Sequence, residues 1–380
     1  MTKSSLLAAT LACAAAAASA APIPVEKIFS EPYGRFHQGE PGKPAILLVH
    51  GTGNGLQAWT APAGDPLGVG DWYFDHEVTP GPIVDEHAKL PGIGIHSFGT
   101  SPQDKAAVNR KNWWDFLVKQ GFTVATWSQP LPLFADAWPS AVAAYGEFLR
   151  LTGSLPVALV GYSRGGLLVR KLLLEKGAQG RVKWAVLLHT PNQGTNWGKL
   201  VSKARAAAEK LGHPKTPFPH PEVRKQYDAV IGRTLVKFIA ENAKPEHAEQ
   251  RAESAMIKEL NAHDKKLDGV SYYTFGGSTP RILRYYVWVY TKGSAVPHRS
   301  GQGVVFHRRA EPKEVSLVSP MWDKLPNPEH FDEVTPGKGD ILVTDASARL
   351  PWAKHRTLPI SHQDAMFHEP LQRQVAALLH

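Results

Sequence analysis

The segment LPVALVGYSRGGLLVRKLLLE, residues 155–175, decides the expected fold. Its first part, the apolar run at 156–160, is typical of a buried parallel strand. From Leu167 onward, apolar residues recur at helical spacing with charged residues between them, up to Gly177. The sequence GYSRG, residues 161–165, joins the two parts directly. The segment therefore predicts a strand, a sharp turn and a helix in immediate succession.

Ser163 occupies the middle of this turn. A serine hydroxyl is a weak nucleophile unless the backbone holds it exposed at the end of a sheet. Gly161 and Gly165 stand two positions to either side, and glycine allows a sharp turn without collisions of a Cβ. We therefore expect Ser163 to be a catalytic nucleophile. The alternative is a glycine-rich strand-to-helix turn that contains an incidental serine.

Strand and helix signals alternate along the rest of the chain. Strands are expected at 45–49, 122–127, 156–160, 182–188, 270–275 and 355–360, and helices at 111–119, 137–151 and 370–379. This alternation predicts a mostly parallel sheet with ligands bound at the carboxyl ends of its strands. His50, Ser163 and His189 all follow such strands.

The remaining stretches carry weaker signals. Residues 21–44 are expected to form an N-terminal arm, 54–103 a long ordered loop and 294–338 a proline-rich and charged excursion. Residues 282–290 fit either a hairpin strand or an aromatic wall.

The N-terminus has the pattern of a secretory signal peptide. Residues 1–20 contain one lysine, an apolar Leu/Ala stretch and a small-residue ending at Ala20. We therefore expect a secreted or periplasmic protein whose mature chain begins at residue 21. The single cysteine, Cys13, lies inside the signal, so no disulfide is expected. A lipoprotein signal at Cys13 is disfavoured because Thr10 stands where such signals prefer leucine.

Composition and charge exclude several classes of function. The 380 residues and 43% hydrophobic content suffice for a large folded core. The net charge of +9 is dispersed along the chain, whereas a nucleic-acid-binding protein would concentrate it in a stripe. We expect no nucleic-acid partner, no transmembrane segment, no metal and no cofactor, and the sequence leaves the oligomeric state open.

Five short motifs together resemble the α/β-hydrolase superfamily, in particular secreted bacterial lipases and esterases. They are HGTG at 50–53, GYSRGG at 161–166, TPNQGT at 190–195, GD at 339–340 and LPISH at 358–362. The resemblance extends from Ala45 to the C-terminus and is interrupted by two unmatched insertions. It implies an α/β-hydrolase domain over 21–380, with a mostly parallel central sheet, flanking helices and a helical cap or lid at 197–267.

The resemblance also implies a catalytic triad of Ser163, Asp340 and His362, in the chain order of the family. His362 stands between the last expected strand and the last helix, where the fold requires the base. The competing histidine, His368, is better suited to capping the helix that begins at Pro370.

Two features of the implied site stay open. The family's usual Asp-Gly pair is here Asp340-Ile341, which keeps Asp345 as an alternative acid. Asp332 and Asp364 are expected to be a surface carboxylate and a loop-capping carboxylate, respectively. The oxyanion hole would use the backbone N–H groups of Arg164 and Thr52.

Several tryptophans could serve the substrate. They either line an acyl groove or pack in the core, and core packing is the expected role for most of them. These tryptophans are Trp59, Trp72, Trp113 and Trp114.

The sequence and the resemblance together predict a carboxylic ester hydrolase acting on hydrophobic acyl esters in the manner of a lipase, with an ester or lipid as its partner. An extracellular polyester depolymerase is the alternative within the same class. A peptidase with the same triad and a non-catalytic binding protein on the same fold are weaker alternatives.

Overall fold

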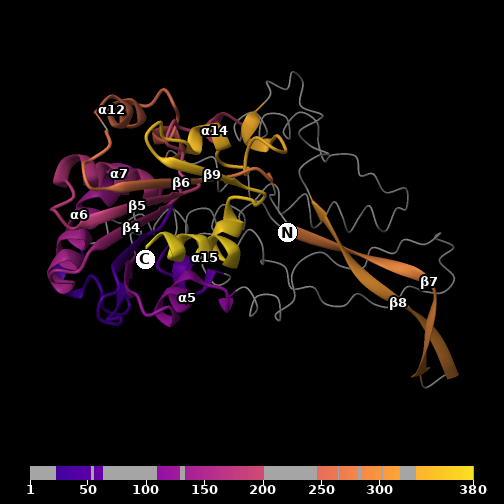
Figure 1. The fold of residues 1–380 in the computed structure, drawn as a ribbon. Helices are drawn as coiled ribbons and strands as arrows, with labels where there is room; N and C mark the ends of the chain where they lie inside the picture. Colours follow the sequence, from indigo (N-terminus) through magenta and orange to yellow (C-terminus); the bar gives the residue numbers. More distant parts are fainter. Residues whose placement is uncertain are drawn as a thin grey trace, which may run out of the picture.

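A seven-stranded sheet forms the centre of the molecule (Figure 1). The computed structural model describes residues 23–52, 55–62, 109–128, 133–200, 246–263, 265–280, 284–300, 303–316 and 331–379. The strands are β1 (Gly34–His37), β2 (Ala45–Val49), β3 (Thr123–Trp127), β4 (Val157–Tyr162), β5 (Val182–Leu188), β6 (Ser271–Gly277) and β9 (Lys354–Leu358).

The sheet is mostly parallel, as the sequence predicts. Its strand order is β1-β3-β2-β4-β5-β6-β9, and only the edge strand β1 runs antiparallel to its neighbour β3. The turns that follow β2, β4 and β5 therefore meet at the carboxyl edge of the sheet. That edge brings His50, Ser163 and His189 into one region of the molecule.

Helices cover both faces of the sheet. The principal ones are α5 (Trp113–Lys119), α6 (Phe134–Leu151), α7 (Arg164–Lys176), α12 (Ala255–His263) and α15 (Glu369–Leu378). Side chains of α6, α7 and α12 pack on one face of the sheet and those of α5 and α15 on the other (Figure 1). The shorter helices are η2 (Val25–Lys27), α2 (Gln57–Thr60), α11 (Glu246–Glu249), η5 (Asp332–Val334), α14 (Asp345–Ala348) and η6 (Gln363–Met366).

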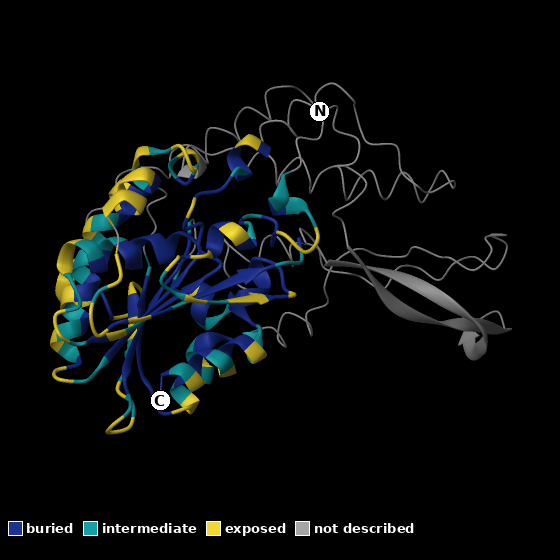
Figure 2. Cartoon of the chain, turned by 45° about the horizontal axis from the view of Figure 1, so that its top comes forward, coloured by how far each residue is buried: buried dark blue, intermediate teal, exposed yellow. Residues whose placement is uncertain are grey.

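All five residues of β2 are apolar because helices cover the sheet on both sides of this strand. Successive side chains of a strand point to opposite faces. Ile46 and Leu48 pack in the cluster beneath α5 and α15, whereas Ala45, Leu47 and Val49 pack in the cluster beneath α6 and α7. Because helices cover both faces, both sets are buried, and most exposed residues lie on the surrounding helices and loops (Figure 2).

Two expectations for the weaker stretches are wrong, those for 21–44 and 294–338, and the hairpin alternative for 282–290 is confirmed. The segment expected to be an N-terminal arm contributes β1, whose four residues are too few for a periodic pattern to reveal them. Residues 282–290 belong to a hairpin strand, because β7 (Arg284–Ser300) pairs antiparallel with β8 (Gly303–Ser316). These strands extend into the expected excursion at 294–338, since both strands of a two-stranded ribbon are edges and tolerate proline.

Parts of the predicted organisation lie outside the described residues. They include the signal peptide at 1–20, most of the loop at 54–103 and residues 201–245 of the predicted cap. The described end of the cap segment contains α12, whose Ile257 and Leu260 pack in the core cluster with α7. This helix thus lies in the connection between β5 and β6, and the cap over 197–267 stays a prediction. Within the described residues, no helix combines the length and apolar character required to cross a membrane.

Candidate active site

Ser163 lies in a strained turn between β4 and α7. Its backbone angles are φ 53° and ψ −127°, outside the region that most residues with a side chain adopt. Such a conformation costs on the order of 1–3 kcal/mol and persists only where the surrounding structure imposes it. The Ser163 N–H donates to the carbonyl of Leu188 in β5, which holds the turn against the neighbouring strand.

The glycines of the turn are required by close backbone packing. A Cβ at Gly165 would lie 2.1 Å from the carbonyl oxygen of Val49, and a Cβ at Gly161 would lie 2.6 Å from the Cα of Gly166. The start of α7 therefore approaches β2 and β4 more closely than a side chain would permit. The GYSRGG pattern follows from this packing.

His362 and Asp340 form a buried pair. The imidazole Nδ1 of His362 lies 2.9 Å from Oδ2 of Asp340, and both side chains are almost inaccessible to solvent. The pair is held close to the serine turn, because the Tyr162 hydroxyl donates to the carbonyl of His362 at 3.1 Å. Three of the residues named from the sequence thus come from β4, the Asp340 loop and the loop after β9 to the same edge of the sheet.

Backbone and side-chain donors surround the Asp340 carboxylate. Its Oδ1 accepts the N–H groups of Leu342 and Val343, at 3.0 and 2.7 Å. Burial raises the pKa of Asp340, but the electrostatic attraction of His362 and the hydrogen bonds from His189 and His362 outweigh burial. The pKa therefore lies well below its usual range. An ionised carboxylate only accepts hydrogen bonds, so His362 donates to it from Nδ1.

The Asp340-Ile341 pair keeps the conformation of an Asp-Gly pair. Ile341 has φ 94°, in the region that favours glycine and is unusual for a β-branched residue. Its side chain is fully buried. Burying an isoleucine contributes about 1.5–3 kcal/mol, which is similar in size to the strain.

The alternative acid and base occupy other surroundings. Asp345 accepts from His355 Nε2 at 2.9 Å and from the Arg349 guanidinium at 2.6 Å. His368 caps α15, as expected, by accepting the N–H of Leu371. The acid beside His362 is therefore Asp340 and not Asp345. The histidine beside Asp340 is His362 and not His368. The two other carboxylates are also as expected: Asp332 pairs with Lys338 on the surface, and Asp364 accepts the N–H of Ser361.

The turn at 50–52, directly after β2, packs against the serine. A Cβ at Gly51 would lie 3.0 Å from the Cβ of Ser163. His50 is fully buried beside it, and burial lowers the pKa of His50 to about 3, so its imidazole is neutral. Gln250 reaches the same turn, with its side-chain amide donating to the Thr52 hydroxyl at 2.8 Å. Sequence reasoning missed this contact, because it joins residues 198 positions apart.

Two of the four tryptophans named from the sequence pack in the core. Trp59 and Trp113 are fully buried, and their rings meet edge to face with centroids 5.9 Å apart. Trp114 is partly buried against the same cluster. Trp72 lies outside the described residues.

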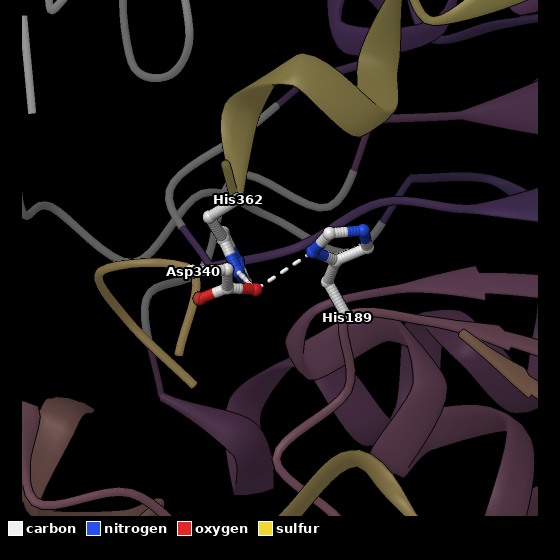
Figure 3. A group of neighbouring side chains, drawn as sticks. All are labelled: His189, Asp340 and His362. Atoms are coloured by element: carbon white, nitrogen blue, oxygen red, sulfur yellow. Dashed lines mark hydrogen bonds and ion pairs between the residues drawn. The ribbon is translucent and has the colours of Figure 1, made fainter. Parts of the chain in front are cut away.

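Sequence reasoning missed the role of His189 in this site. Its Nδ1 lies 2.7 Å from Oδ2 of Asp340, the same oxygen that His362 contacts (Figure 3). The position of His189 directly after the β5 sequence was the available signal. His189, Asp340 and His362 also offer ligand atoms within 4.8 Å of one another, so they are the candidate residues if a metal binds here.

Comparisons with known proteins found similar solved structures at low sequence identity. No family model matches the chain, and no curated protein matches it. Among solved structures, Bacillus licheniformis lipase BlEst2 in its mature form is similar, with 16% identity, a TM-score of 0.47, and coverage of 91% of this chain and 98% of that chain. EstA from Clostridium botulinum has 12% identity and a TM-score of 0.43, with 94% and 92% covered.

The fold assignment rests on the chain's own sheet order and on the strained strand-to-helix turn at Ser163. On these grounds the chain has the α/β-hydrolase fold.

Proposed function

We propose that this protein is a secreted serine hydrolase that cleaves carboxylic esters through Ser163, His362 and Asp340. The observation that carries the proposal is the buried His362–Asp340 hydrogen bond beside the strained Ser163 turn. A serine nucleophile, a base and a carboxylate that orients the base are the parts that acyl transfer requires.

In the proposed reaction, Ser163 Oγ attacks the ester carbonyl carbon and its proton passes to Nε2 of His362. Asp340 holds the Nδ1–H of His362 and stabilises the imidazolium that forms. The tetrahedral intermediate then collapses, and the alcohol leaves with the proton from His362. Water attacks the resulting acyl-enzyme in the same manner, which releases the acid and restores Ser163.

The proposed oxyanion hole consists of the backbone N–H groups of Arg164 and Thr52. Arg164 directly follows Ser163 and is the first residue of α7. The packing of Gly51 against Ser163 supports a role for the adjacent Thr52. In acyl-transfer enzymes, each such donor is worth roughly 10²- to 10³-fold in rate.

The proposed substrates are esters with hydrophobic acyl chains, as for a lipase. The predicted export through residues 1–20 and the predicted cap over 197–267 support this choice, since a cap can form one wall of an acyl site and open at an interface. The net charge of +9 would also suit an anionic surface outside the cell.

Substrate profiling tests the proposal. Purified wild-type protein and Ser163→Ala are assayed on p-nitrophenyl esters of increasing chain length, emulsified triglyceride, polyester film and a peptide anilide. We expect the wild type alone to hydrolyse esters and to favour longer acyl chains. Preference for the film would move the assignment to a depolymerase, and cleavage of the anilide without the esters would move it to a peptidase. Absence of all hydrolysis would contradict an enzymatic role.

A further inference from the structure

Asp340 accepts hydrogen bonds from two imidazoles at one oxygen. His189 Nδ1 lies 2.7 Å from Oδ2 and His362 Nδ1 lies 2.9 Å from it (Figure 3). The three side chains are nearly inaccessible to solvent, with exposures of 0%, 1% and 2% for His189, Asp340 and His362. A triad requires only one imidazole on its carboxylate, so the second calls for an explanation.

The fold holds His189 in this position by several means. The residue follows β5 with φ 50°, a conformation that histidine tolerates better than most residues. Its N–H donates to the carbonyl of Phe275 in β6 at 2.7 Å. Gly277 leaves room for the ring, because a Cβ there would lie 2.7 Å from Cε1 of His189. A strained backbone and an opposing glycine indicate that the position of this imidazole is constrained.

We propose that His189 is a positioning residue for the proposed ester hydrolysis, because its Nδ1–H holds Asp340 in the orientation that His362 requires. This inference rests on the proposed function. With His189 present, Oδ1 is held by the N–H groups of Leu342 and Val343 and Oδ2 by the two imidazoles. These contacts on both oxygens prevent the carboxylate from rotating about its Cβ–Cγ bond.

Removal of His189 leaves Oδ2 with His362 as its imidazole donor. The buried carboxylate then gains freedom to turn or to admit water, and the His362 ring loses its fixed orientation. A displacement of about 1 Å in a catalytic group can cost on the order of 10²-fold in rate. The loss should fall on turnover and not on substrate affinity, because His189 contacts the acid and its side chain is fully buried.

The experiment compares His189→Leu with His189→Asn. Leucine removes the donor, whereas asparagine carries an amide N–H near the place of Nδ1 and tolerates positive φ. His355→Leu is the matched control, because His355 also contacts a carboxylate, Asp345, at 2.9 Å but does not contact Asp340. For each protein, kcat and KM are measured on a soluble p-nitrophenyl ester, and thermal unfolding is followed by circular dichroism.

We expect His189→Leu to lower kcat by about 10- to 100-fold with KM nearly unchanged. His189→Asn should restore kcat to within a few-fold of the wild type. His355→Leu should keep kcat even if it unfolds at a lower temperature. If His189→Leu instead fails to fold, the asparagine variant decides between the interpretations.

Three results would overturn the inference. The first is full turnover in a folded His189→Leu. The second is a loss in His189→Asn as deep as in His362→Ala, which would make His189 the base itself. The third is an equal loss of kcat in His355→Leu, which would show that the loss in His189→Leu comes from lower stability and not from the position of Asp340. An active wild type separates these failures from a failure of the proposed function, in which the wild type itself would neither turn over esters nor react with a fluorophosphonate.

Discussion

His362 donates its Nδ1–H to Oδ2 of Asp340 at 2.9 Å, inside the protein and 22 positions along the chain from it. The backbone strengthens this relationship, because the N–H of His362 also donates to the carbonyl of Asp340 at 2.9 Å. The base is therefore fixed to its acid by side chain and main chain together.

The first prediction concerns the acid. Asp340→Asn should lower kcat by roughly 10³-fold or more, because the amide would favour the wrong tautomer of His362. Asp345→Asn should leave kcat nearly unchanged, since Asp345 contacts His355 and Arg349. Steady-state kinetics on a soluble ester would measure both. Small and equal losses in the two variants would remove Asp340 from the site.

The second prediction separates the two histidines of the C-terminal region. His362→Ala should abolish turnover. His368→Ala should keep turnover and lose up to about 1 kcal/mol of unfolding free energy, because it removes the cap of α15. Kinetics and urea unfolding of both variants provide the comparison. The opposite ranking of the two activities would assign the base to His368.

The third prediction concerns stability and pH. Burial lowers the pKa of His50 to about 3 in the folded protein, against 6.5 as the ordinary value. Between these pH values the unfolded chain binds a proton that the folded chain does not, so the unfolding free energy falls as pH falls below 6.5. His50→Gln should remove up to about 1.4 kcal/mol per pH unit of this dependence. Denaturant unfolding at pH 5 and pH 7 measures the difference, and parallel losses in both proteins would contradict it.

The fourth prediction concerns metal ions. Dialysis against EDTA should leave turnover unchanged, because hydrogen bonds between imidazole and carboxylate account for the positions of His189, Asp340 and His362. Turnover is measured before and after chelation, with stability as a control. A loss that a divalent cation restores would show that these residues hold a metal ion.

The predictable parts of the site are local in sequence. The turn at Ser163 follows from apolar spacing and glycines within residues 155–175, and the place of His362 follows from its position between the last strand and the last helix. The sequence does not decide between Asp340 and Asp345 as the acid. Ile341 adopts a positive φ that a glycine at this position would have indicated, whereas isoleucine does not.

The missed features depend on contacts between distant residues or on very short elements. His189 meets Asp340 across 151 positions, so no spacing pattern in the sequence records the contact. The four residues of β1 form a strand because β3 lies beside them, and too few residues are present for an alternating pattern to show.

The central claim is that Ser163 is an activated nucleophile. A fluorophosphonate probe tests it directly, because such probes react with activated serines without requiring knowledge of the substrate. After reaction of wild-type protein, mass spectrometry of the digested chain should find the adduct on Ser163. Ser163→Ala should take up no probe, and His362→Ala should react far more slowly. An unlabelled wild type, or an adduct on a different serine, would contradict the account.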